Sequence, residues 1–300
     1  MPNFQTFLAP AKINLFLHIT GQRADGYHLL QTVFRLIDLH DTIQLSVRED
    51  GIINRVNDIA GVPAEHDLCV RAARLLQKHN DCTLGVDLQV EKRIPMGGGL
   101  GGGSSDAATV LLALNRLWQL DLKRRDLLQL GLQLGADVPF FIHGQNAWAE
   151  GVGEQLQSIS LADACYLVLT PDVHVSTAQI FANKQLTKNA IPKTMSDFSR
   201  ASNSVVPNSA NDNSNTEFTN HLEKVVCNDY PAVSACLTWL KQFGDARMSG
   251  SGASVFLEVA NEKIANEIWQ QKPKELLGFS VQGFVAKGLN QHPLIDFVSH

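Results

Sequence analysis

A run of glycines between residues 95 and 105 constrains this chain more than any other feature. The sequence there reads Pro-Met-Gly-Gly-Gly-Leu-Gly-Gly-Gly-Ser-Ser, so six glycines precede two serines. Glycine has no Cβ, so such a loop can adopt positive φ and bring its amide N–H groups close to a ligand. A flexible hinge is the alternative, but a linker requires neither six glycines nor a helix that opens directly from it. We therefore interpret the segment as an anion-binding loop.

The pattern after the loop predicts an amphipathic helix. Apolar residues recur there at spacings of three and four: Ala107, Leu111, Leu114 and Trp118. We expect Ser104, Ser105 or Asp106 to be the N-cap of this helix. The unpaired amides and the positive dipole end of the helix would then face the loop, and phosphate is the expected ligand.

Three known classes of phosphate loop do not fit. A Walker A loop requires a lysine directly after the glycines, and none occurs between Arg93 and Lys123. The glycine spacing does satisfy the dinucleotide-binding fingerprint. However, Asp121, near the offset of a ribose-binding acid, falls between two helical stretches (105–118 and 123–134) and not at a strand end. The His-Arg-Asp and Asp-Phe-Gly motifs of protein kinases are absent from the sequence.

Length and composition indicate a globular protein with a large core. The chain has 300 residues, of which 44% are hydrophobic, and this favours two domains over one compact domain. We place the boundary near residue 160, which gives an N-terminal domain 1–160 and a C-terminal domain 161–300. The formal net charge is −5 without a basic block, so the sequence offers no support for nucleic-acid binding.

The same composition indicates a cytoplasmic protein. Five cysteines are scattered without a Cys-x-x-Cys pair, which is typical of reduced thiols and not of a disulfide framework or a zinc site. The N-terminus lacks the basic and apolar regions of a signal peptide, and no apolar run is long enough to span a membrane. We therefore expect neither secretion nor membrane insertion.

Near the N-terminus, alternation of apolar and polar residues over 13–20 predicts a strand with one core face. Lys12 and Asn14 project from the same face of this strand, which suits the binding of one ligand. A solvated lysine is the alternative interpretation of Lys12 taken alone.

A turn at Asp25-Gly26 leads into a second β-rich run at 29–47. Tyr27 and His28 would lie at the mouth of the resulting hairpin, close to the strand of Lys12. An aromatic residue beside a turn can also simply anchor the loop.

The residues around the glycine loop follow the order that an anion site requires. A helix at 66–79 and a strand at 86–90 precede the loop, so strand, loop and helix follow one another. Further on, Asp137 stands between a Gly-Ala break and a Val-Pro step. It can cap a short helix that begins near Pro139, or it can be a carboxylate positioned to take a proton from a hydroxyl.

The second half of the chain contains fewer functional signals. We expect a strand at 165–171 and a helix that begins at Ser176 or Thr177. The span 187–220 is dense in Asn, Ser and Thr, so we expect a long polar loop, partly disordered and dispensable for folding of the core. A second glycine-serine turn lies within 245–259, where an ordinary hairpin is the favoured interpretation.

Three separated motifs together resemble the small-molecule kinase superfamily of galactokinase, homoserine kinase, mevalonate kinase and phosphomevalonate kinase. They are Pro-Ala-Lys-Ile-Asn at 10–14, the glycine loop at 95–105 and Met-Ser-Gly-Ser-Gly-Ala at 248–253. The sequences at 21–28 and 135–141 are similar to members that act on a cytidine diphosphate ester of methylerythritol. The resemblance implies two α+β domains with the active site in the cleft between them.

The resemblance also implies an activity and a set of site residues. The activity is transfer of phosphate from ATP to the 2-hydroxyl of methylerythritol, in the non-mevalonate route to isoprenoids. Asp137 would be the base, and Lys12 would orient and polarise the hydroxyl. The remaining implied contacts are Asn14, Tyr27, His28 and Phe181 for the cytidyl substrate, and Pro95, Met96, Gly97, Gly98, Gly99, Leu100, Gly101, Gly102, Gly103, Ser104 and Ser105 for ATP.

The implied co-substrate is ATP with Mg²⁺ bound to the nucleotide, within reach of Ser105. The implied partners are small molecules only, and we expect a monomer or a weak homodimer. One departure is Asp67, where the family pattern leads us to expect asparagine near the adenine, because a carboxylate cannot donate to a base nitrogen.

Two alternatives remain open from the sequence. One is a homoserine or mevalonate type of kinase, and the aromatic residues Tyr27, His28 and Phe181 argue against it because those substrates offer no base to stack. The other is a nucleotide-binding regulator without catalysis, which the presence of both Lys12 and Asp137 argues against.

Overall fold

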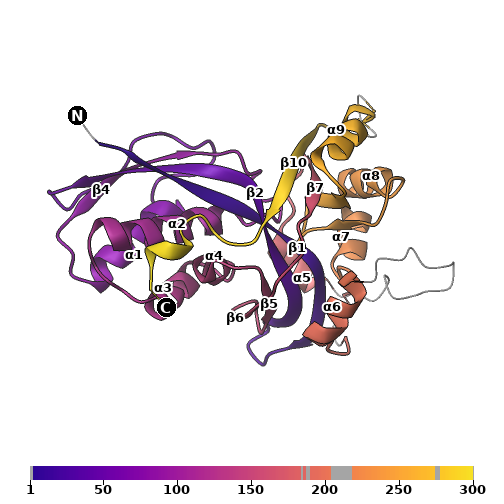
Figure 1. Cartoon of the computed structure of the whole chain (residues 1–300), viewed down its shortest axis with the longest axis horizontal. Coiled ribbons are helices and arrows are strands. Elements are labelled where there is room, and N and C mark those ends of the chain that lie inside the picture. Colours follow the sequence, from indigo (N-terminus) through magenta and orange to yellow (C-terminus); the bar gives the residue numbers. More distant parts are fainter. Residues whose placement is uncertain (1–2, 184, 187–189, 204–217, 274–277, 300) are drawn as a thin grey trace.

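The computed structural model describes the chain apart from residues 1–2, 184, 187–189, 204–217, 274–277 and 300. The strands are β1 (Gln5–Gln22), β2 (His28–Arg48), β3 (Ile53–Arg55), β4 (Gly85–Glu91), β5 (Ala147–Glu150), β6 (Gln155–Ser158), β7 (Cys165–Pro171), β8 (Ala246–Met248), β9 (Val255–Val259) and β10 (Val281–Leu289). The helices are α1 (Leu68–His79), α2 (Gly102–Leu117), α3 (Arg124–Leu134), α4 (Val138–His143), α5 (Thr177–Ala182), α6 (Met195–Asn203), α7 (Glu223–Asp229), α8 (Pro231–Leu240) and α9 (Glu262–Gln270), followed by a 3₁₀ turn at Ile295–Phe297. The α+β class predicted from the sequence is confirmed (Figure 1).

The sheet joins the two halves of the molecule. Its order is β3-β4-β2-β10-β7-β9-β8, and β1 and β5 both pair with β2. Helices α1 and α2 pack on β1, β2 and β4 in the first half, and α3 and α4 pack against these two helices, whereas α8 and α9 pack on β7, β9 and β10 in the second half. Strand β10 pairs with both β2 and β7, so it connects the halves. None of the described helices is both long enough and apolar enough to cross a bilayer.

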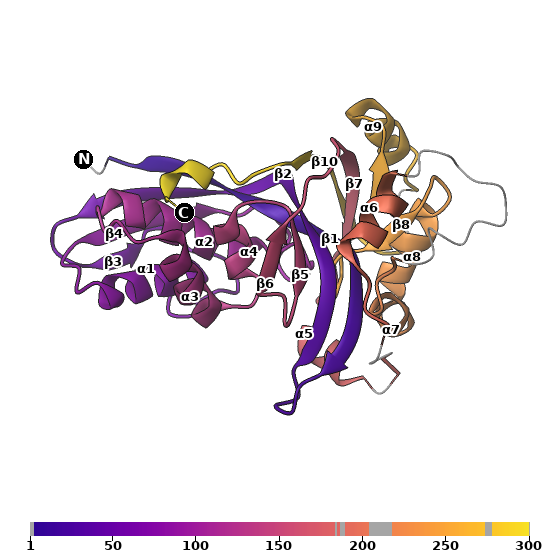
Figure 2. The same ribbon diagram turned by 60° about the horizontal axis from the view of Figure 1, so that its bottom comes forward.

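Strand β1 takes part in every hydrophobic core of the described chain. Ala9 packs in the core beneath α1 to α4, Ile13 packs in a central core, and Ile19 packs in the core of the second half. Figure 2 shows the long β1–β2 pair bending at the junction of the halves. Lys12 and Asn14 therefore lie at this junction, held by packing on both sides.

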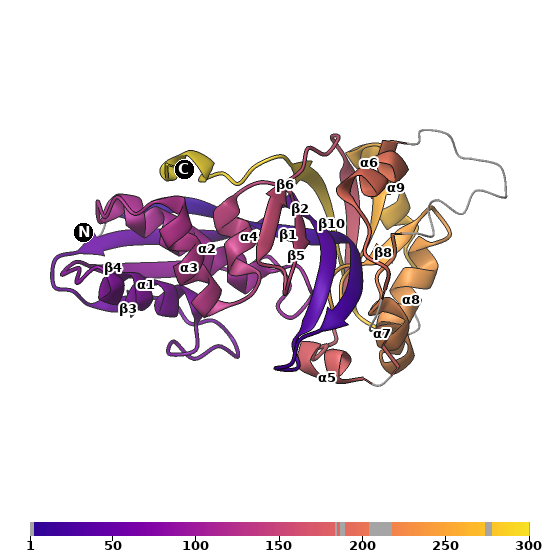
Figure 3. The same ribbon diagram turned by 90° about the horizontal axis from the view of Figure 1, so that it is seen from below.

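The far end of the β1–β2 pair lies beside α5, as Figure 3 shows from below. Ser176 caps α5 by accepting a hydrogen bond from the backbone N of Gln179, which confirms the predicted start of this helix. This arrangement brings a segment of the second half next to the hairpin that follows Lys12.

Three expectations from the sequence were wrong. Strand β1 was expected to have one core face, but it is buried on both faces: Phe16 and His18 are as buried as the apolar side chains of the opposite face. The reason is that the second half of the molecule covers the face expected to be polar. The N-cap of α2 is Gly101 with φ of 73°, not a serine or aspartate. The span 187–220 was expected to be a polar loop, but it contains α6, and Phe198 and Phe218 pack in the central core. Residues 187–189 and 204–217 of that span lie outside the described residues.

The C-terminal segment returns to the first half and is anchored by buried polar groups. His292 is fully buried; its Nδ1 accepts from Leu294 N at 3.0 Å, and its Nε2 lies 3.5 Å from Thr109 Oγ1. Arg124 donates to the carbonyls of Ile295 and Val298. Burial, with a smaller contribution from the Arg124 charge, lowers the pKa of His292 to about 3. The segment is therefore held by a neutral imidazole.

This arrangement predicts how stability changes with pH. The unfolded chain protonates His292 near its ordinary pKa of about 6.5, whereas the folded chain does not until about pH 3, so stability is lost as pH falls below about 6.5. The free energy of unfolding at pH 5 should be lower than at pH 7 by about 2 kcal/mol. Urea unfolding at pH 7 and pH 5 should show this loss in the parent protein and not in His292→Gln. The exposed His66→Gln serves as control, and equal pH dependence of His292→Gln and the parent would contradict the assignment.

Candidate active site

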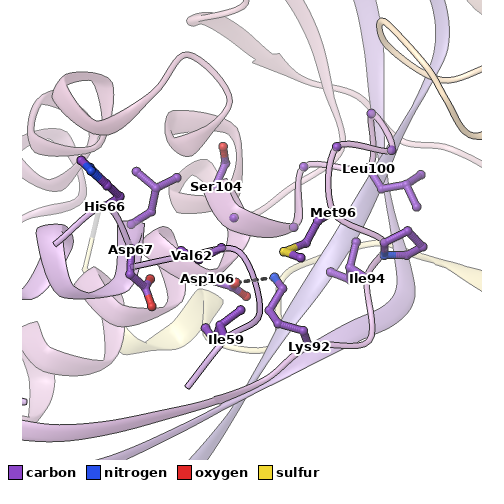
Figure 4. A pocket seen from close by; sticks show the side chains of 18 residues that line it. Ile59, Val62, His66, Asp67, Lys92, Ile94, Met96, Leu100, Ser104 and Asp106 are labelled. Carbon is purple, nitrogen blue, oxygen red and sulfur yellow. Dashed lines mark hydrogen bonds and ion pairs between the residues drawn. The ribbon is translucent and has the colours of Figure 1, made fainter. Parts of the chain in front are cut away.

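Two pockets meet at the glycine loop. The helix-side pocket, about 390 Å³, is lined by Ile59, Val62, His66, Asp67, Leu68, Lys92, Ile94, Asp106 and the loop from Pro95 to Ser104 (Figure 4). The strand-side pocket, about 490 Å³, is lined by Lys12, Asn14, Thr32, Asp137 and Phe181 among other residues. Gly97, Gly99, Gly101 and Ser104 line both pockets, so a ligand held by the loop is open to both.

The glycines are required by backbone packing as well as by any ligand. Gly99 has φ of 76°, and a Cβ at this position would lie 2.4 Å from the carbonyl oxygen of Ser249. Gly101 has φ of 73° at the start of α2, where a Cβ would lie 2.9 Å from the Phe141 ring. The loop thus has a fixed shape imposed by its neighbours.

The two serines after the loop have different environments. Ser105 is fully buried, donates from Oγ to the carbonyl of Pro10 at 2.6 Å and lines neither pocket. Ser104 lines both pockets. With Gly101 as N-cap and without a side-chain cap on α2, the first amides of this helix remain available to an anion.

The second glycine-serine turn packs against the loop, so it is more than the ordinary hairpin favoured from the sequence. Ser254 donates from its backbone N to Gly98 O at 3.0 Å, and Ser249 Oγ donates to Gly99 O at 3.1 Å. Ser249 Oγ in turn accepts from the backbone N of Asn14 at 3.2 Å. The turn therefore connects the glycine loop with β1.

Lys12 and Asn14 lie on the same face of β1, as the alternation predicts. Lys12 Nζ donates to Asn14 Oδ1 at 2.7 Å and lies 5.2 Å from the centre of the Phe34 ring. The backbone N of Lys12 donates to Leu100 O at 2.9 Å, which ties β1 to the glycine loop. Both side chains are buried, so the solvated alternative for Lys12 does not hold.

Asp137 precedes α4 but its side chain does not cap that helix, all of whose residues are described. Its Oδ2 lies 3.4 Å from Lys12 Nζ, and about a third of the side chain is exposed (36%). The carboxylate therefore faces the strand-side pocket, beside the ammonium group and within reach of a ligand.

The aromatic residues named from the sequence are only partly brought together. Phe181 lines the strand-side pocket, and its ring stacks on His28 with 5.2 Å between centroids and 27° between planes. Tyr27 is 66% exposed and lies outside the pocket lining. One flat face for a base is thus present, next to a buried imidazole.

An ionic cluster that the sequence did not reveal lies beneath the helix-side pocket. Lys92 Nζ donates to Asp41 and, at 2.6 Å, to Asp106, and Figure 4 shows the Lys92–Asp106 contact. Asp41 also accepts from the backbone N of Ile94. Burial raises the pKa of Asp106 above its ordinary value; the nearby Asp41 adds to this shift, and the Lys92 ammonium group opposes it. The cluster fixes where the chain enters the loop and where α2 leaves it.

Asp67, the departure noted in the sequence, has a structural role. Its Oδ1 accepts from the backbone N of Cys69 at 2.8 Å as the N-cap of α1, and its Oδ2 pairs with Arg55 at 2.9 Å. It also lines the helix-side pocket. Among the described residues, no three His, Cys, Asp or Glu side chains gather closely enough to hold a metal ion.

Comparison with known proteins agrees with this geometry. Residues 67–145 match the model of the GHMP kinases N terminal domain, and residues 202–275 match that of the GHMP kinases C terminal domain. The chain is 54% identical to 4-diphosphocytidyl-2-C-methyl-D-erythritol kinase of Thiobacillus denitrificans, covering 98% of this chain and 99% of that protein. It is 52% identical to the kinase of the same name from Nitrosospira multiformis, covering 96% of this chain and 92% of that protein.

A solved structure is similar over nearly the whole length. It is a crystal structure of 4-(cytidine 5'-diphospho)-2C-methyl-D-erythritol kinase, with a TM-score of 0.78 and 30% identity, covering 95% of this chain and 99% of that one. The chain therefore belongs to the GHMP kinases and, within them, to the family of 4-diphosphocytidyl-2-C-methyl-D-erythritol kinases.

Proposed function

We propose that this protein transfers the γ-phosphoryl group of ATP to the 2-hydroxyl of 4-diphosphocytidyl-2-C-methyl-D-erythritol, giving the 2-phosphate and ADP, in non-mevalonate isoprenoid precursor biosynthesis. The observation that carries the proposal is the Lys12–Asp137 pair, 3.4 Å apart, in a pocket that shares the glycine loop with a second pocket. The names of the relatives at about half identity support the choice of substrate.

ATP is assigned to the helix-side pocket, with its phosphates on the loop. The amides of residues 96–104, which include the open N-terminus of α2, supply donors to phosphate oxygens. Since phosphoryl transfer depends mainly on positioning and charge stabilisation, preorganised amides of this kind suit the reaction. The structure favours Ser104 over Ser105 as the serine near the phosphates, because the Ser105 hydroxyl donates to Pro10.

The acceptor is assigned to the strand-side pocket, which opens to the same loop. Asp137 takes the proton of the attacking hydroxyl, and Lys12 orients the hydroxyl and offsets the developing charge. Asn14 lines the same pocket, and Phe181, which stacks on His28, provides a face for the cytosine. Tyr27 is proposed as a further contact of the base from the adjacent turn.

Mg²⁺ is proposed to arrive with ATP and to neutralise charge on its phosphates. Mg²⁺ retains several waters and binds through substrate phosphates and one or two protein oxygens. The oxygen-bearing side chains beside the loop, Ser104 and Asp137, fit this limited contribution.

We further propose two domains, 1–160 and 161–300, with the C-terminal segment of the second packed on the first, in a cytoplasmic protein that is a monomer or weak homodimer. Small molecules are its proposed partners, without nucleic acid or membrane. The net charge of −5 supports the absence of a nucleic-acid partner.

The chemical step gives the first test of this proposal. Asp137→Asn keeps the shape of the side chain and removes the base, so kcat should fall by ~10²–10⁴-fold while both substrates still bind. Lys12→Met should also lower kcat, and the double variant should lose less than the product of the single losses because both residues act on one hydroxyl. Coupled ADP-release kinetics with the cytidyl substrate measures these effects. Asp163→Asn, at an exposed position outside both pockets, is the control. Near-full turnover of Asp137→Asn would rule out Asp137 as the general base.

The assignment of Phe181 to the cytosine predicts that its replacement weakens binding of the cytidyl substrate and leaves binding of ATP unchanged. Stacking on an aromatic ring is worth about 1–3 kcal/mol per base, so Phe181→Leu should weaken binding of the cytidyl substrate roughly tenfold. Phe181→Tyr keeps the flat face and should bind close to normally. Isothermal titration with each substrate separates the cases, and equal losses for ATP and the cytidyl substrate would show that Phe181 is only structural.

The loop itself is best tested at Gly103. A Cβ there would lie 3.4 Å from Leu68 Cδ1, an ordinary contact, whereas Gly99 and Gly102 are crowded by their neighbours. Ala is favoured over Gly in a helix by about 1 kcal/mol, so Gly103→Ala should not lower the melting temperature. The added methyl should raise the KM for ATP several-fold with the KM for the acceptor unchanged. An unchanged KM for ATP would contradict the assignment of the ATP phosphates to the start of α2.

A further inference from the structure

The position of the Lys12 ammonium group depends on a side-chain amide. Lys12 Nζ donates to Asn14 Oδ1 at 2.7 Å, a shorter contact than the 3.4 Å to Asp137 Oδ2. Lys12 is 3% exposed and Asn14 is 2% exposed, so water does not replace a lost partner easily. Whatever orients the amide of Asn14 therefore also places the ammonium group.

The orientation of this amide follows from the available protons. An ammonium group only donates, so Asn14 must present its oxygen to Lys12. The amide nitrogen then points the other way, where Asn14 Nδ2 donates to Thr32 Oγ1 at 2.9 Å. Thr32 is 1% exposed and belongs to β2, the strand paired with β1.

The hydroxyl of Thr32 can only accept from Asn14. Its one proton is donated to the carbonyl oxygen of Phe16, a group that cannot donate in return. This contact lies where the β1–β2 register shifts, between Asn14 and Leu17, and Thr32 pairs with Leu17 on the far side of the shift. The irregularity of the ladder thus places one hydroxyl between a backbone carbonyl and the Asn14 amide.

We propose that Thr32 is a positioning residue for phosphoryl transfer, which fixes the Asn14 amide through its Phe16-bound hydroxyl and thereby places Lys12 beside Asp137. The inference rests on the proposed function and adds a residue to its mechanism. With valine at position 32 the amide loses its acceptor and is free to rotate. If it turns over, its NH₂ group faces the ammonium group, and Lys12 moves away from the reacting hydroxyl.

Kinetics of Thr32→Val and Thr32→Ser tests the proposal. Valine has a similar shape without the hydroxyl, so kcat should fall roughly tenfold or more while the KM for ATP stays within about twofold, as expected for loss of one buried hydrogen-bond acceptor. Serine retains the hydroxyl and should restore most of kcat. Thr109→Val, which removes another buried hydroxyl near His292, is the matched control and should retain the parent kcat.

A double-mutant cycle separates positioning from other roles. In an Asn14→Ala background, Thr32→Val should lower kcat little further, because the amide through which it acts is gone. An undiminished loss in that background would show that Thr32 contacts the substrate or only supports the fold, and would overturn the proposal. A parent-like kcat of folded Thr32→Val, or a Thr32→Ser variant as slow as Thr32→Val, would overturn it too.

A measurement without substrate keeps the inference distinct from the proposed function. In a crystal structure of Thr32→Val, the Lys12 Nζ to Asn14 Oδ1 distance should exceed hydrogen-bonding range, whereas Thr32→Ser should keep the contact. If Thr32→Val does not fold, the smaller Thr32→Ala is used against Thr32→Ser in the same way. An unchanged Lys12 position refutes the inference, whereas an inactive parent enzyme with the cytidyl substrate refutes only the proposed function.

Discussion

The site depends on the contact between two glycine turns that lie far apart in the sequence. Gly99 approaches the backbone at Ser249 so closely that a Cβ would lie 2.4 Å from its carbonyl oxygen, and Ser254 donates back to Gly98. Strand β1 lies against both turns through the backbone N groups of Lys12 and Asn14. Any larger side chain at Gly99 would push the two glycine turns apart. Glycine is therefore required at this position for packing within the protein, whether or not a ligand is bound.

Local pattern predicted the strands and helices on either side of the glycine loop, and two-residue alternation predicted that Lys12 and Asn14 share a face. Those inferences succeeded because periodicity reflects backbone geometry within one element. The meeting of Lys12 with Asp137 could not be derived this way, since nothing local relates β1 to α4; only the family resemblance suggested it. The structure places the two side chains 3.4 Å apart and shows that Asp137 does not cap α4.

Other parts of the site had no sequence signal. Asp41, Lys92 and Asp106 form one cluster from β2, the loop entry and α2, and no spacing rule connects them. The N-cap of α2 was missed because the close packing of the loop selects glycine at position 101 over a capping side chain. The second buried face of β1 was missed because the half that covers it comes later in the chain.

The charges beside the loop determine what an anion there would encounter. Lys92 donates to Asp41 and to Asp106 beside the helix-side pocket, and the Asp41 carboxylate largely offsets its charge before any ligand binds. Lys12 is held by a neutral amide at 2.7 Å and by one partly exposed carboxylate at 3.4 Å. Because interaction energy falls with distance and with solvent exposure, more of the Lys12 charge remains available to a phosphoryl group. Under the proposed function, a transition state between the pockets would therefore be stabilised by loop amides and by Lys12, and the hydrogen bonds that fix Lys12 would contribute to catalysis.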